Sequence, residues 1–497
     1  MDIPKNIKNT IKELEKNGYE AFIVGGCVRD LLLEREPNDW DITTNALPED
    51  VLKVFPDGKY ENDFGTVILP IRNKKDELED VLEITTYRSE QGYSDRRRPD
   101  EVVFEKDIDK DLSRRDFTVN ALAAKFKNSK IKIKKDILTH VIEKDDLVIV
   151  DLFGGVKDSK KKIIRAVGEP IDRFKEDALR MMRAIRLAGQ LNFNIEEKTE
   201  RAITKMAGSI KFIAKERIAI ELVKMLSSDH PYEGIKLLYN TKLLQYILPE
   251  LLDGVGVKQD RHHIYTVFEH NLLSLKHCPS KDWRVRFSAL LHDVGKPKTK
   301  VIRDGIATFY NHEYVSARIA SRVNKRLRFS QKDSEKIHTL VKAHMFYYNT
   351  DEVTAASVRR LIKKVGKENL ADLIDLRVAD RLGSGTPKAM PYKLRHLQYM
   401  MEKVQNDPVS VKMLKINGGD LMNILKIEPS PKIGTILDVL LSEVIEDPKL
   451  NTKKYLEKKA KELNEMDAGT LREKAKEVIE EKREEDDKKI KKEFWVK

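Results

Sequence analysis

The sequence predicts a mixed α+β domain at the N-terminus, followed by a long region that is mostly helical. Up to about residue 155, short apolar runs of β-type composition (AFIV, TVILPI, VLEITTY, KIKIKK and LVIVDLF) alternate with helical segments. From about residue 156, apolar residues recur at intervals of three and four, as in ALRMMRAIRLAGQL, RIAIELVKML and FEHNLLSLKH, which is typical of amphipathic helices. A length of 497 residues suits three or four domains with ample core.

Composition and charge limit the class of protein. The 94 Lys and Arg exceed the 82 Asp and Glu by only 12, so the net charge alone is weak support for a polyanionic partner. Two cysteines, Cys27 and Cys278, exclude a disulfide framework and a zinc ribbon and favour a reducing compartment. No apolar stretch approaches the roughly 18 residues needed to span a bilayer. We therefore expect a soluble, cytoplasmic protein that does not bind a membrane, of undetermined oligomeric state.

Pro, Gly and polar residues cluster near residues 230–234, 249–260 and 383–391, where we expect breaks between helical segments. The region after Asn451 is dense in Lys and Glu, with Leu456, Ala460 and Leu463 at helical spacing. Because its acidic residues balance its basic ones, a solvated helix with i,i+4 ion pairs is favoured over a dedicated RNA-binding arm.

The segment AFIVGGCVRDLLL predicts a strand, a tight Gly25-Gly26 turn and the start of a helix. In this geometry, backbone N–H groups and a helix N-terminus face an anion, and Arg29 in the first turn is placed to contact a triphosphate. A strand-Gly-Gly-helix turn alone is more often merely a turn.

Ten residues after Arg29, Asp39 and Asp41 are two apart in the sequence. In an extended chain both carboxylates share one face, the arrangement that holds a pair of divalent ions. An isolated Asp-x-Asp is often just a solvent-facing strand, but the Gly-Gly turn upstream favours the metal site. Oxygen ligands favour Mg²⁺, and Glu83 in VLEITTYR is a candidate third carboxylate.

The segments GGCVRDLLL and DWD are followed by DLSRRDFTVNALA (111–123), DLFGGVKD (151–158), EDALRMMRAIRLAGQL (176–191) and AKERIAIELVKML (214–226). Together these ordered motifs, over about 200 residues, resemble the class II tRNA nucleotidyltransferase and bacterial poly(A) polymerase family. The resemblance implies that Asp39 and Asp41 bind the catalytic metals and that Gly25, Gly26 and Arg29 meet the incoming triphosphate. It further implies a ribose and phosphate pocket formed by Arg115, Asp116 and Asn120.

The helix predicted over EDALRMMRAIR carries Asp177, Arg180, Arg183 and Arg186 at every third position, and Leu179, Met182 and Ile185 should pack inward. Cytosine and adenine both present an amino donor beside a ring-nitrogen acceptor. One carboxylate and one guanidinium would accept these bases and leave buried groups unpaired against uracil and guanine. As in the family, Asp177 and Arg180 would form this template, with Arg183 and Arg186 supporting the base or phosphates. An ordinary amphipathic helix would show similar charges.

The segment 86–104 contains YSDRRRP, which resembles the flexible loop of CCA-adding enzymes, and 416–451 is similar to a C-terminal segment of such enzymes. The resemblance therefore implies addition of CMP and AMP to tRNA from CTP and ATP with Mg²⁺. A poly(A) polymerase, or an enzyme adding only CC or only A, stays open.

A second set of motifs, RHHIYTVFEHNLL (261–273), ALLHDVGKPKT (289–299), FYNHEYVSARIA (309–320) and LRVADRLGSG (376–385), resembles an HD-domain metal phosphohydrolase. The resemblance implies a transition-metal site, with Ni²⁺, Co²⁺ or Mn²⁺, held by His270, His292, Asp293 and Asp380. Further candidates are His312 and His344, with His262 or His263 nearby. A lone histidine on an apolar helix is more often a core residue, but the His-Asp pair before Gly-Lys-Pro is harder to explain that way.

The predicted architecture is a palm-like nucleotidyltransferase head over residues 1–155, a helical neck that binds RNA and nucleobase over 156–252, an HD domain over 253–390, and a helical tail over 391–497. A rival of another class is a metal phosphohydrolase whose N-terminal half only binds RNA. A purely structural interaction protein is least favoured, because it gives no reason for this order of acids, arginines and glycines.

Overall fold

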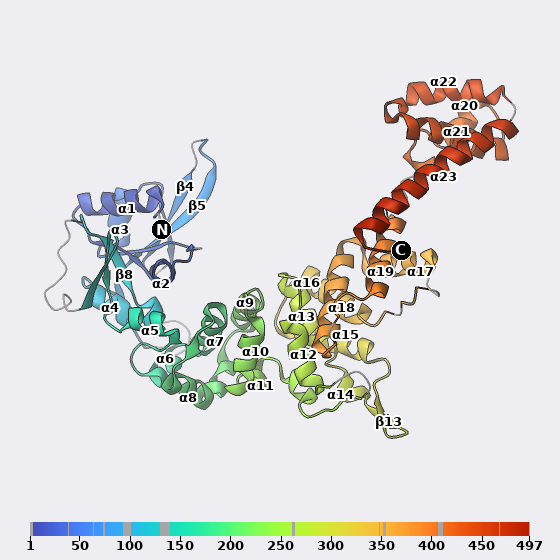
Figure 1. Cartoon of the computed structure of the whole chain (residues 1–497). Helices are drawn as coiled ribbons and strands as arrows, with labels where there is room; N and C mark the ends of the chain where they lie inside the picture. Colours follow the sequence, from blue (N-terminus) through green and yellow to red (C-terminus); the bar gives the residue numbers. More distant parts are fainter. Residues whose placement is uncertain are drawn as a thin grey trace. The chain divides into compact units, whose positions relative to one another are not determined.

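The computed structural model describes residues 3–37, 39–62, 64–72, 75–92, 101–129, 140–260, 264–346, 348–350, 354–386, 388–405, 411–466 and 468–496 (Figure 1). The chain divides into two compact units. The first comprises Met1–Lys342 with Ala379–Thr386, and the second comprises Ala343–Val378 with Pro387–Lys497.

A mixed sheet forms the N-terminal part of the first unit (Figure 1). Over the described residues it has eight strands in the order β3-β4-β5-β2-β1-β8-β10-β9. Their bounds are β1 Ala21–Val24, β2 Asp41–Thr44, β3 Lys59–Asn62, β4 Thr66–Arg72, β5 Leu78–Thr86, β8 Ala123–Phe126, β9 Val141–Lys144 and β10 Leu147–Val150. Strands β2 and β5 are parallel and the other neighbouring pairs are antiparallel, which confirms the predicted α+β class.

Both faces of the central strand β1 are buried, although in two different clusters. Ala21 and Ile23 belong to a core that also contains Ile11 of helix α1 (Lys5–Lys16). Phe22 and Val24 belong to a smaller cluster on the other face. A strand covered on both faces is apolar throughout rather than alternating, which explains the continuous AFIV run.

Helices surround the sheet and then form the rest of the first unit. Their bounds are α2 Gly26–Leu32, α3 Pro48–Val54, α4 Ile108–Ser113, α5 Gly155–Lys161, α6 Pro170–Glu176, α7 Leu179–Leu191, α8 Glu197–Met206, α9 Lys215–Leu226, α10 Pro231–Asn240, α11 Leu244–Ile247, α12 Val267–Lys276, α13 Trp283–Leu291, α14 Lys296–Thr299, α15 His312–Arg326 and α16 Gln331–Ala343. One hydrophobic cluster extends from Phe117 through α7, α9, α12 and α13 to Val341. The division into head, neck, HD domain and tail stays a prediction.

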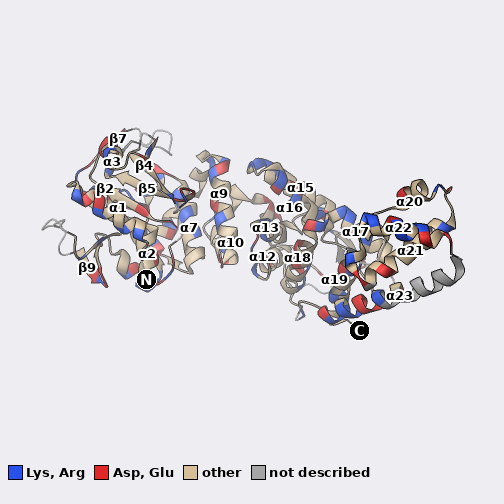
Figure 2. Cartoon of the chain, turned by 90° about the horizontal axis from the view of Figure 1, so that it is seen from above, with Lys and Arg blue, Asp and Glu red and all other residues tan. Residues whose placement is uncertain are grey.

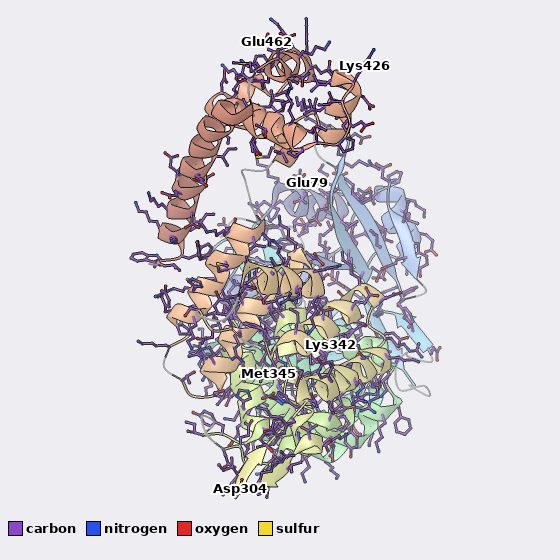
Figure 3. The ribbon with its side chains drawn as sticks, turned by 90° about the vertical axis from the view of Figure 1, so that its right-hand side faces the viewer. Glu79, Asp304, Lys342, Met345, Lys426 and Glu462 are labelled. Carbon is purple, nitrogen blue, oxygen red and sulfur yellow. The ribbon has the colours of Figure 1, made fainter. Side chains whose placement is uncertain are left out.

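Six short strands of the described residues lie outside the main sheet of the first unit, in three pairs. Their bounds are β6 Arg88–Gln91, which pairs with β7 Glu101–Phe104, β11 Ile163–Ile164, which pairs with β12 Asn194–Ile195, and β13 Val301–Arg303, which pairs with β14 Ile306–Thr308. Asp304 and Gly305 connect β13 and β14 with φ angles of +50° and +76°, as in a tight hairpin turn, and Figure 3 marks Asp304 at this tip.

The second unit is helical where it is described. Its helices are α17 Ala355–Val365, α19 Tyr392–Gln405, α20 Gly418–Leu425, α21 Pro431–Glu446, α22 Lys453–Asn464 and α23 Ala468–Glu493, while α18 Leu370–Gly383 contributes residues to both units. Leu456, Ala460 and Leu463 of α22 are buried in its core, which confirms their predicted spacing. Figure 2 shows Lys and Arg gathered on α17. Among the described helices, none is long and apolar enough to cross a membrane.

Candidate active site

The turn between β1 and α2 lets other groups approach the main chain closely. Gly25 has a φ of +83°, and α2 begins at the next residue, Gly26, which confirms the predicted strand, turn and helix. A Cβ atom on Gly25 would lie 2.9 Å from Nη1 of Arg115 and 3.6 Å from Oδ2 of Asp41. A larger residue would therefore displace a guanidinium that stands beside a carboxylate.

Three carboxylates gather near the start of β2. Asp41 begins the strand and is in register with Glu83 of β5, while Asp39 lies exposed just before the strand. Burial raises the pKa of Asp41 and the charge of Asp39 adds to this, against the opposing effect of Arg115. Burial and the charge of Asp41 likewise raise the pKa of Glu83. The structure thus places Asp41 beside Glu83 in the sheet, with Asp39 nearby, and their role in holding a divalent cation stays a prediction.

Arg115 is held by an acid behind it. Asp111, which is fully buried in α4, accepts hydrogen bonds from Arg114 at 2.5 Å and from Arg115 at 3.1 Å. Burial opposes the ionisation of Asp111, but the two guanidinium groups outweigh it and lower the pKa of this carboxyl. The pair of arginines is therefore fixed to one internal charge.

Asp116 and Asn120 connect two arginines from distant parts of the chain. Asp116 accepts hydrogen bonds from Nε of Arg183 at 2.7 Å and from Nδ2 of Asn120 at 3.3 Å. Arg29 donates to Oδ1 of the same Asn120 at 2.6 Å. Burial opposes the ionisation of Asp116, yet Arg183 and then Arg180 outweigh it and lower the pKa. Hydrogen bonds thus connect Arg29 of α2 and Arg183 of α7 through two residues that precede β8.

The prediction that Asp177 belongs to the same helix as the three arginines is wrong. Helix α6 ends at Glu176, α7 begins at Leu179, and Asp177 lies between them with extended backbone angles of −141° and 107°. Its Oδ1 accepts from the backbone N–H of Leu179 at 2.9 Å, satisfying a donor that a helix start leaves unpaired. Leu179, Met182 and Ile185 are buried, as predicted.

Asp177 and Arg180 each have a further ionic partner. Arg217 of α9 contacts both carboxylate oxygens of Asp177, at 2.7 Å and 3.3 Å. Arg180 donates to Glu176 at 2.5 Å and to the backbone carbonyl of Arg114 at 3.3 Å. Arg217 was not among the predicted site residues, although its motif was noted, because no sequence spacing connects it to Asp177.

A cavity of about 420 Å³ joins groups from all of these segments. It is lined by Gly25, Gly26, Asp41, Phe64, Arg88, Glu90, Arg114, Arg115, Asp116, Asn120, Asp177, Arg180 and Arg183. Asp39, Arg29 and Arg186 were also predicted for the site but are not among the lining residues. Arg29 reaches the network through Asn120, and Arg186 pairs with Glu221 at 2.6 Å. The roles of all these residues stay predictions.

The prediction missed four lining residues. Glu90 of β6 contacts Arg88 at 3.0 Å and Arg114 at 3.1 Å, and the Arg88 guanidinium lies 5.7 Å from the ring centroid of Phe64. The one available signal was the period of two that puts Arg88 and Glu90 on one side of a strand. The loop core at residues 93–99, on which the preference for CCA addition depended, lies outside the described residues.

A second cluster of titratable groups lies elsewhere in the first unit. The Nε2 atoms of His270 and His292 are 3.0 Å apart, and Oδ2 of Asp293 lies 3.1 Å and 3.4 Å from them. Oδ1 of Asp380 lies 3.4 Å from Nε2 of His270, and Nε2 of His312 lies 3.0 Å from the other oxygen of Asp293. The structure thus brings together the four residues predicted for the HD site. His262 and His263 lie outside the described residues.

One hydrogen bond fixes the tautomer of the His292 imidazole in its neutral form. Nδ1 of His292 lies 2.8 Å from the carbonyl of Ala289, which only accepts, so that Nδ1 carries a hydrogen and, in the neutral ring, Nε2 is left with a lone pair. Burial opposes protonation of His292, but Asp293 and Asp380 raise its pKa to about 10. The carboxylates therefore favour a positive charge at this point, which either a proton or a metal ion satisfies.

Comparisons with known proteins identify the family of the chain. The profile of the Poly A polymerase head domain matches residues 21–165, that of the probable RNA and SrmB-binding site of polymerase A matches 192–254, and that of a putative tRNA nucleotidyltransferase domain 2 matches 306–460. The CCA-adding enzyme of Ligilactobacillus salivarius is 32% identical over 474 residues, covering 93% of this chain and 98% of the relative. That of Lactobacillus helveticus is 45% identical over 250 residues, but this alignment covers only 50% of this chain and 55% of the relative.

A solved structure is similar over the same extent. The crystal structure of the Bacillus stearothermophilus CCA-adding enzyme in complex with CTP is 25% identical, with a TM-score of 0.57, and the match covers 93% of this chain and 98% of that chain. Since the profile matches cover the head that contains the paired aspartates and the whole-length relatives share one name, the chain belongs to the family of CCA-adding enzymes.

Proposed function

We propose that this chain is a CCA tRNA nucleotidyltransferase, which transfers CMP and AMP from CTP and ATP to the 3′ end of tRNA without a nucleic-acid template. The observation that carries the proposal is the 420 Å³ cavity, because Asp41, Arg115 and Arg180 come from three separate parts of the chain and line one space. Membership of the family supplies the substrate class. Both cysteines are free, which suits the reducing cytoplasm, where we place the reaction.

The carboxylates near β2 are the proposed Mg²⁺ ligands. Asp39 and Asp41 would hold the ions, with Glu83 beside Asp41 in the sheet register, and this all-oxygen set fits Mg²⁺. When bound, Mg²⁺ would lower the pKa of the attacking hydroxyl and neutralise charge on the leaving phosphates. The residues themselves hold and orient the reactants, a contribution that depends on precise placement.

The reaction is an in-line displacement. The 3′ hydroxyl of the RNA loses its proton to solvent and its oxygen forms a bond to the α-phosphorus of the nucleotide, the bond from that phosphorus to the bridging oxygen breaks, and pyrophosphate leaves with the electron pair. The backbone of Gly25 and Gly26 and the guanidinium of Arg115 line the cavity beside Asp41 and would receive the triphosphate. Arg183 and Asn120, bonded through Asp116, would support the ribose or phosphates.

Asp177 and Arg180 are the proposed nucleobase template. A carboxylate accepts from the amino group shared by cytosine and adenine, and a guanidinium donates to the adjacent ring nitrogen. Uracil and guanine present a carbonyl oxygen in place of that amino group, which would leave the carboxylate without a donor. Both side chains line the same cavity as Asp41, so that one nucleotide can reach all three.

The test uses tRNA that lacks its last three nucleotides, incubated with each NTP alone and with all four, followed by sequencing of the RNA 3′ ends. We expect ordered addition of C, C and A. Long tracts of A from ATP on generic RNA would instead identify a poly(A) polymerase, and addition of CC alone or A alone would identify a partial enzyme. No addition to any RNA would overturn the proposal.

We infer a second activity, that of a metal-dependent phosphohydrolase, from the second cluster. We call this group of His270, His292, Asp293 and Asp380 the HD cluster. The supporting observation is that His270, His292 and Asp293 are all buried, with their ligand atoms within 4.8 Å of one another. Such a site, with Asp380 as a fourth ligand, suits Ni²⁺, Co²⁺ or Mn²⁺ and would activate a water against a phosphoester.

This second activity is tested by metal analysis of the purified full-length chain, with phosphatase and 2′,3′-cyclic phosphodiesterase assays in added Ni²⁺, Co²⁺ or Mn²⁺. Bound metal with hydrolysis supports it. Absence of both bound metal and hydrolysis would remove it, without affecting nucleotide addition. A double change of Asp39→Ala and Asp41→Ala separates the two activities, since only transfer should be lost.

A further inference from the structure

Arg217 occupies a position behind the nucleobase template. It lies in the first turn of α9, and its two terminal nitrogens contact the two oxygens of Asp177, Nη2 to Oδ2 at 2.7 Å and Nη1 to Oδ1 at 3.3 Å. Only 25% of the Arg217 side chain and 13% of the Asp177 side chain are exposed. A two-point contact of this kind fixes the plane of the carboxylate as well as its position.

The hydrogen bonds to Asp177 determine what its carboxylate still offers a ligand. Oδ1 accepts from the backbone of Leu179 and from Arg217, while Oδ2 accepts from Arg217. An ionised carboxylate has about four acceptor sites, two on each oxygen. These three contacts therefore leave about one site, on Oδ2, for a donor in the cavity.

We propose that Arg217 is a positioning residue for nucleotide selection, which holds Asp177 so that one acceptor site faces the base. This inference rests on the proposed CCA-adding function. The single site matches the one amino group that cytosine and adenine share. Without the guanidinium, the carboxylate gains rotational freedom and more open acceptor sites, so that it can also meet the ring N–H of uracil or guanine.

The guanidinium of Arg217 is separate from the packing of its helix. Helix α9 is anchored by Ile218, Leu222 and Leu226, which are at most 1% exposed. The charged end of Arg217 points instead to Asp177, whose Oδ1 accepts from the first backbone N–H of α7. A change at the end of this side chain should therefore alter the template more than the fold.

The experiment compares Arg217→Gln, Arg217→Lys and the control Lys224→Gln, an exposed residue on the same helix. Steady-state kcat and KM are measured for CTP, ATP, UTP and GTP on tRNA lacking its CCA end and on tRNA ending in CC. For Arg217→Gln we expect kcat/KM for CTP and ATP to fall about 10- to 100-fold and the preference for CTP over UTP to fall about tenfold or more. Both losses should be smaller in Arg217→Lys, and Lys224→Gln should have the kcat/KM values and the CTP preference of the wild type.

If Arg217 had a merely structural role, Arg217→Gln would lower kcat/KM equally for all four nucleotides. The ratios of kcat/KM between nucleotides would then stay unchanged, which would overturn the inference. In Asp177→Ala, adding Arg217→Gln should cause no further loss of discrimination, because Arg217 acts through Asp177. Should Arg217→Gln fail to fold, the same ratios in Arg217→Lys decide the matter. A wild-type enzyme that adds no CCA overturns the proposed function itself, whereas normal CCA addition with unchanged ratios in the variants overturns only the role of Arg217.

Discussion

The two candidate sites of the first unit use charged side chains in opposite ways. The proposed nucleotide cavity has a volume of about 420 Å³ and is lined by five arginines, Arg88, Arg114, Arg115, Arg180 and Arg183, each bonded to an acid such as Glu90, Asp111, Asp116 or Glu176. The HD cluster is compact and buried, with two imidazoles and two carboxylates whose contacts are all within 3.7 Å.

The difference indicates the size of the ligand that each site can take. Arginines already paired with acids keep further donors free, so a large polyanion can add to the network without leaving any carboxylate uncompensated. In the HD cluster, by contrast, Asp293 and Asp380 raise the pKa of His292 to about 10, which means that the cluster favours one small positive charge. These differences favour the proposed nucleotide at the first site and the proposed metal ion at the second.

The largest expected effect separates the two sites at Asp41. Changing Asp41→Asn removes a carboxylate at the proposed Mg²⁺ position, and we expect kcat for CMP and AMP addition to fall about 10³-fold. Rapid-quench assays with labelled tRNA measure this loss. The control is Asp50→Asn on α3, where the Asp50 carboxylate pairs with Lys53 at 2.8 Å. Nearly full activity in Asp41→Asn would show that this acid does not hold the catalytic metal.

A second prediction examines whether the HD cluster binds metal independently of transfer. We expect His292→Ala to weaken binding of Ni²⁺, Co²⁺ or Mn²⁺ by about 100-fold or more, because it removes a buried ligand. Metal content by mass spectrometry and titration calorimetry measure this, with His338→Ala as control, since His338 bonds Ser321 outside the cluster. CCA addition should stay unchanged. Equal metal binding by the two variants would contradict the assignment.

The smallest expected effect concerns stability near the HD cluster rather than either activity. Asp282 caps α13, accepting from the backbone of Arg284 at 2.9 Å, and pairs with the side chains of Arg284 and Lys336. We expect Asp282→Ala to lower the free energy of unfolding by about 1 kcal/mol and Asp282→Asn, which keeps a capping oxygen, by less. Urea titration at pH 7 measures both, and equal values for the two variants would mean that the charge, not the cap, matters.

The same residue gives a pH dependence. Burial raises the pKa of Asp282, but its bonds to Arg284 and Lys336 outweigh this and lower the pKa well below its usual range. Its contribution is thus complete above the unfolded-state value of about 3.9 and is lost as the pH falls through the lower folded value. The difference between wild type and Asp282→Asn should accordingly shrink below about pH 4. A difference that grows in acid would contradict this.

The sequence predicted the parts of the fold that local patterns determine. Continuous apolar runs such as AFIV gave the central strands, and Gly25-Gly26 gave the turn, because positive φ angles favour glycine. Ordered motifs also predicted nine of the thirteen residues that line the cavity. Periodicity placed Asp177 inside a helix, however, because it cannot detect a side chain that accepts from the backbone at the start of the following helix.

Contacts between distant segments could not be predicted from one sequence. Arg217 lies 40 residues after Asp177, and Glu90 lies 24 residues before Arg114, so no local spacing connects either pair. Arg186 shows the opposite error. The regular spacing of the arginines predicted it as a site residue, but its side chain pairs with Glu221 and does not line the cavity. Long-range ion pairs decide which members of a charged stripe are available to a ligand.

The break between α6 and α7 has a consequence for the order of addition. Asp177 bonds the first turn of α7 and Arg180 lies in that turn, so any shift of the helix carries both groups together. The carboxylate of Asp177 and the guanidinium of Arg180 therefore keep a constant spacing, which suits a pyrimidine and a purine equally when both present the same two polar atoms. We therefore expect the switch from C to A to depend on the space that the lengthening RNA leaves beside Asp177 and Arg180. The spacing between these two side chains should stay the same.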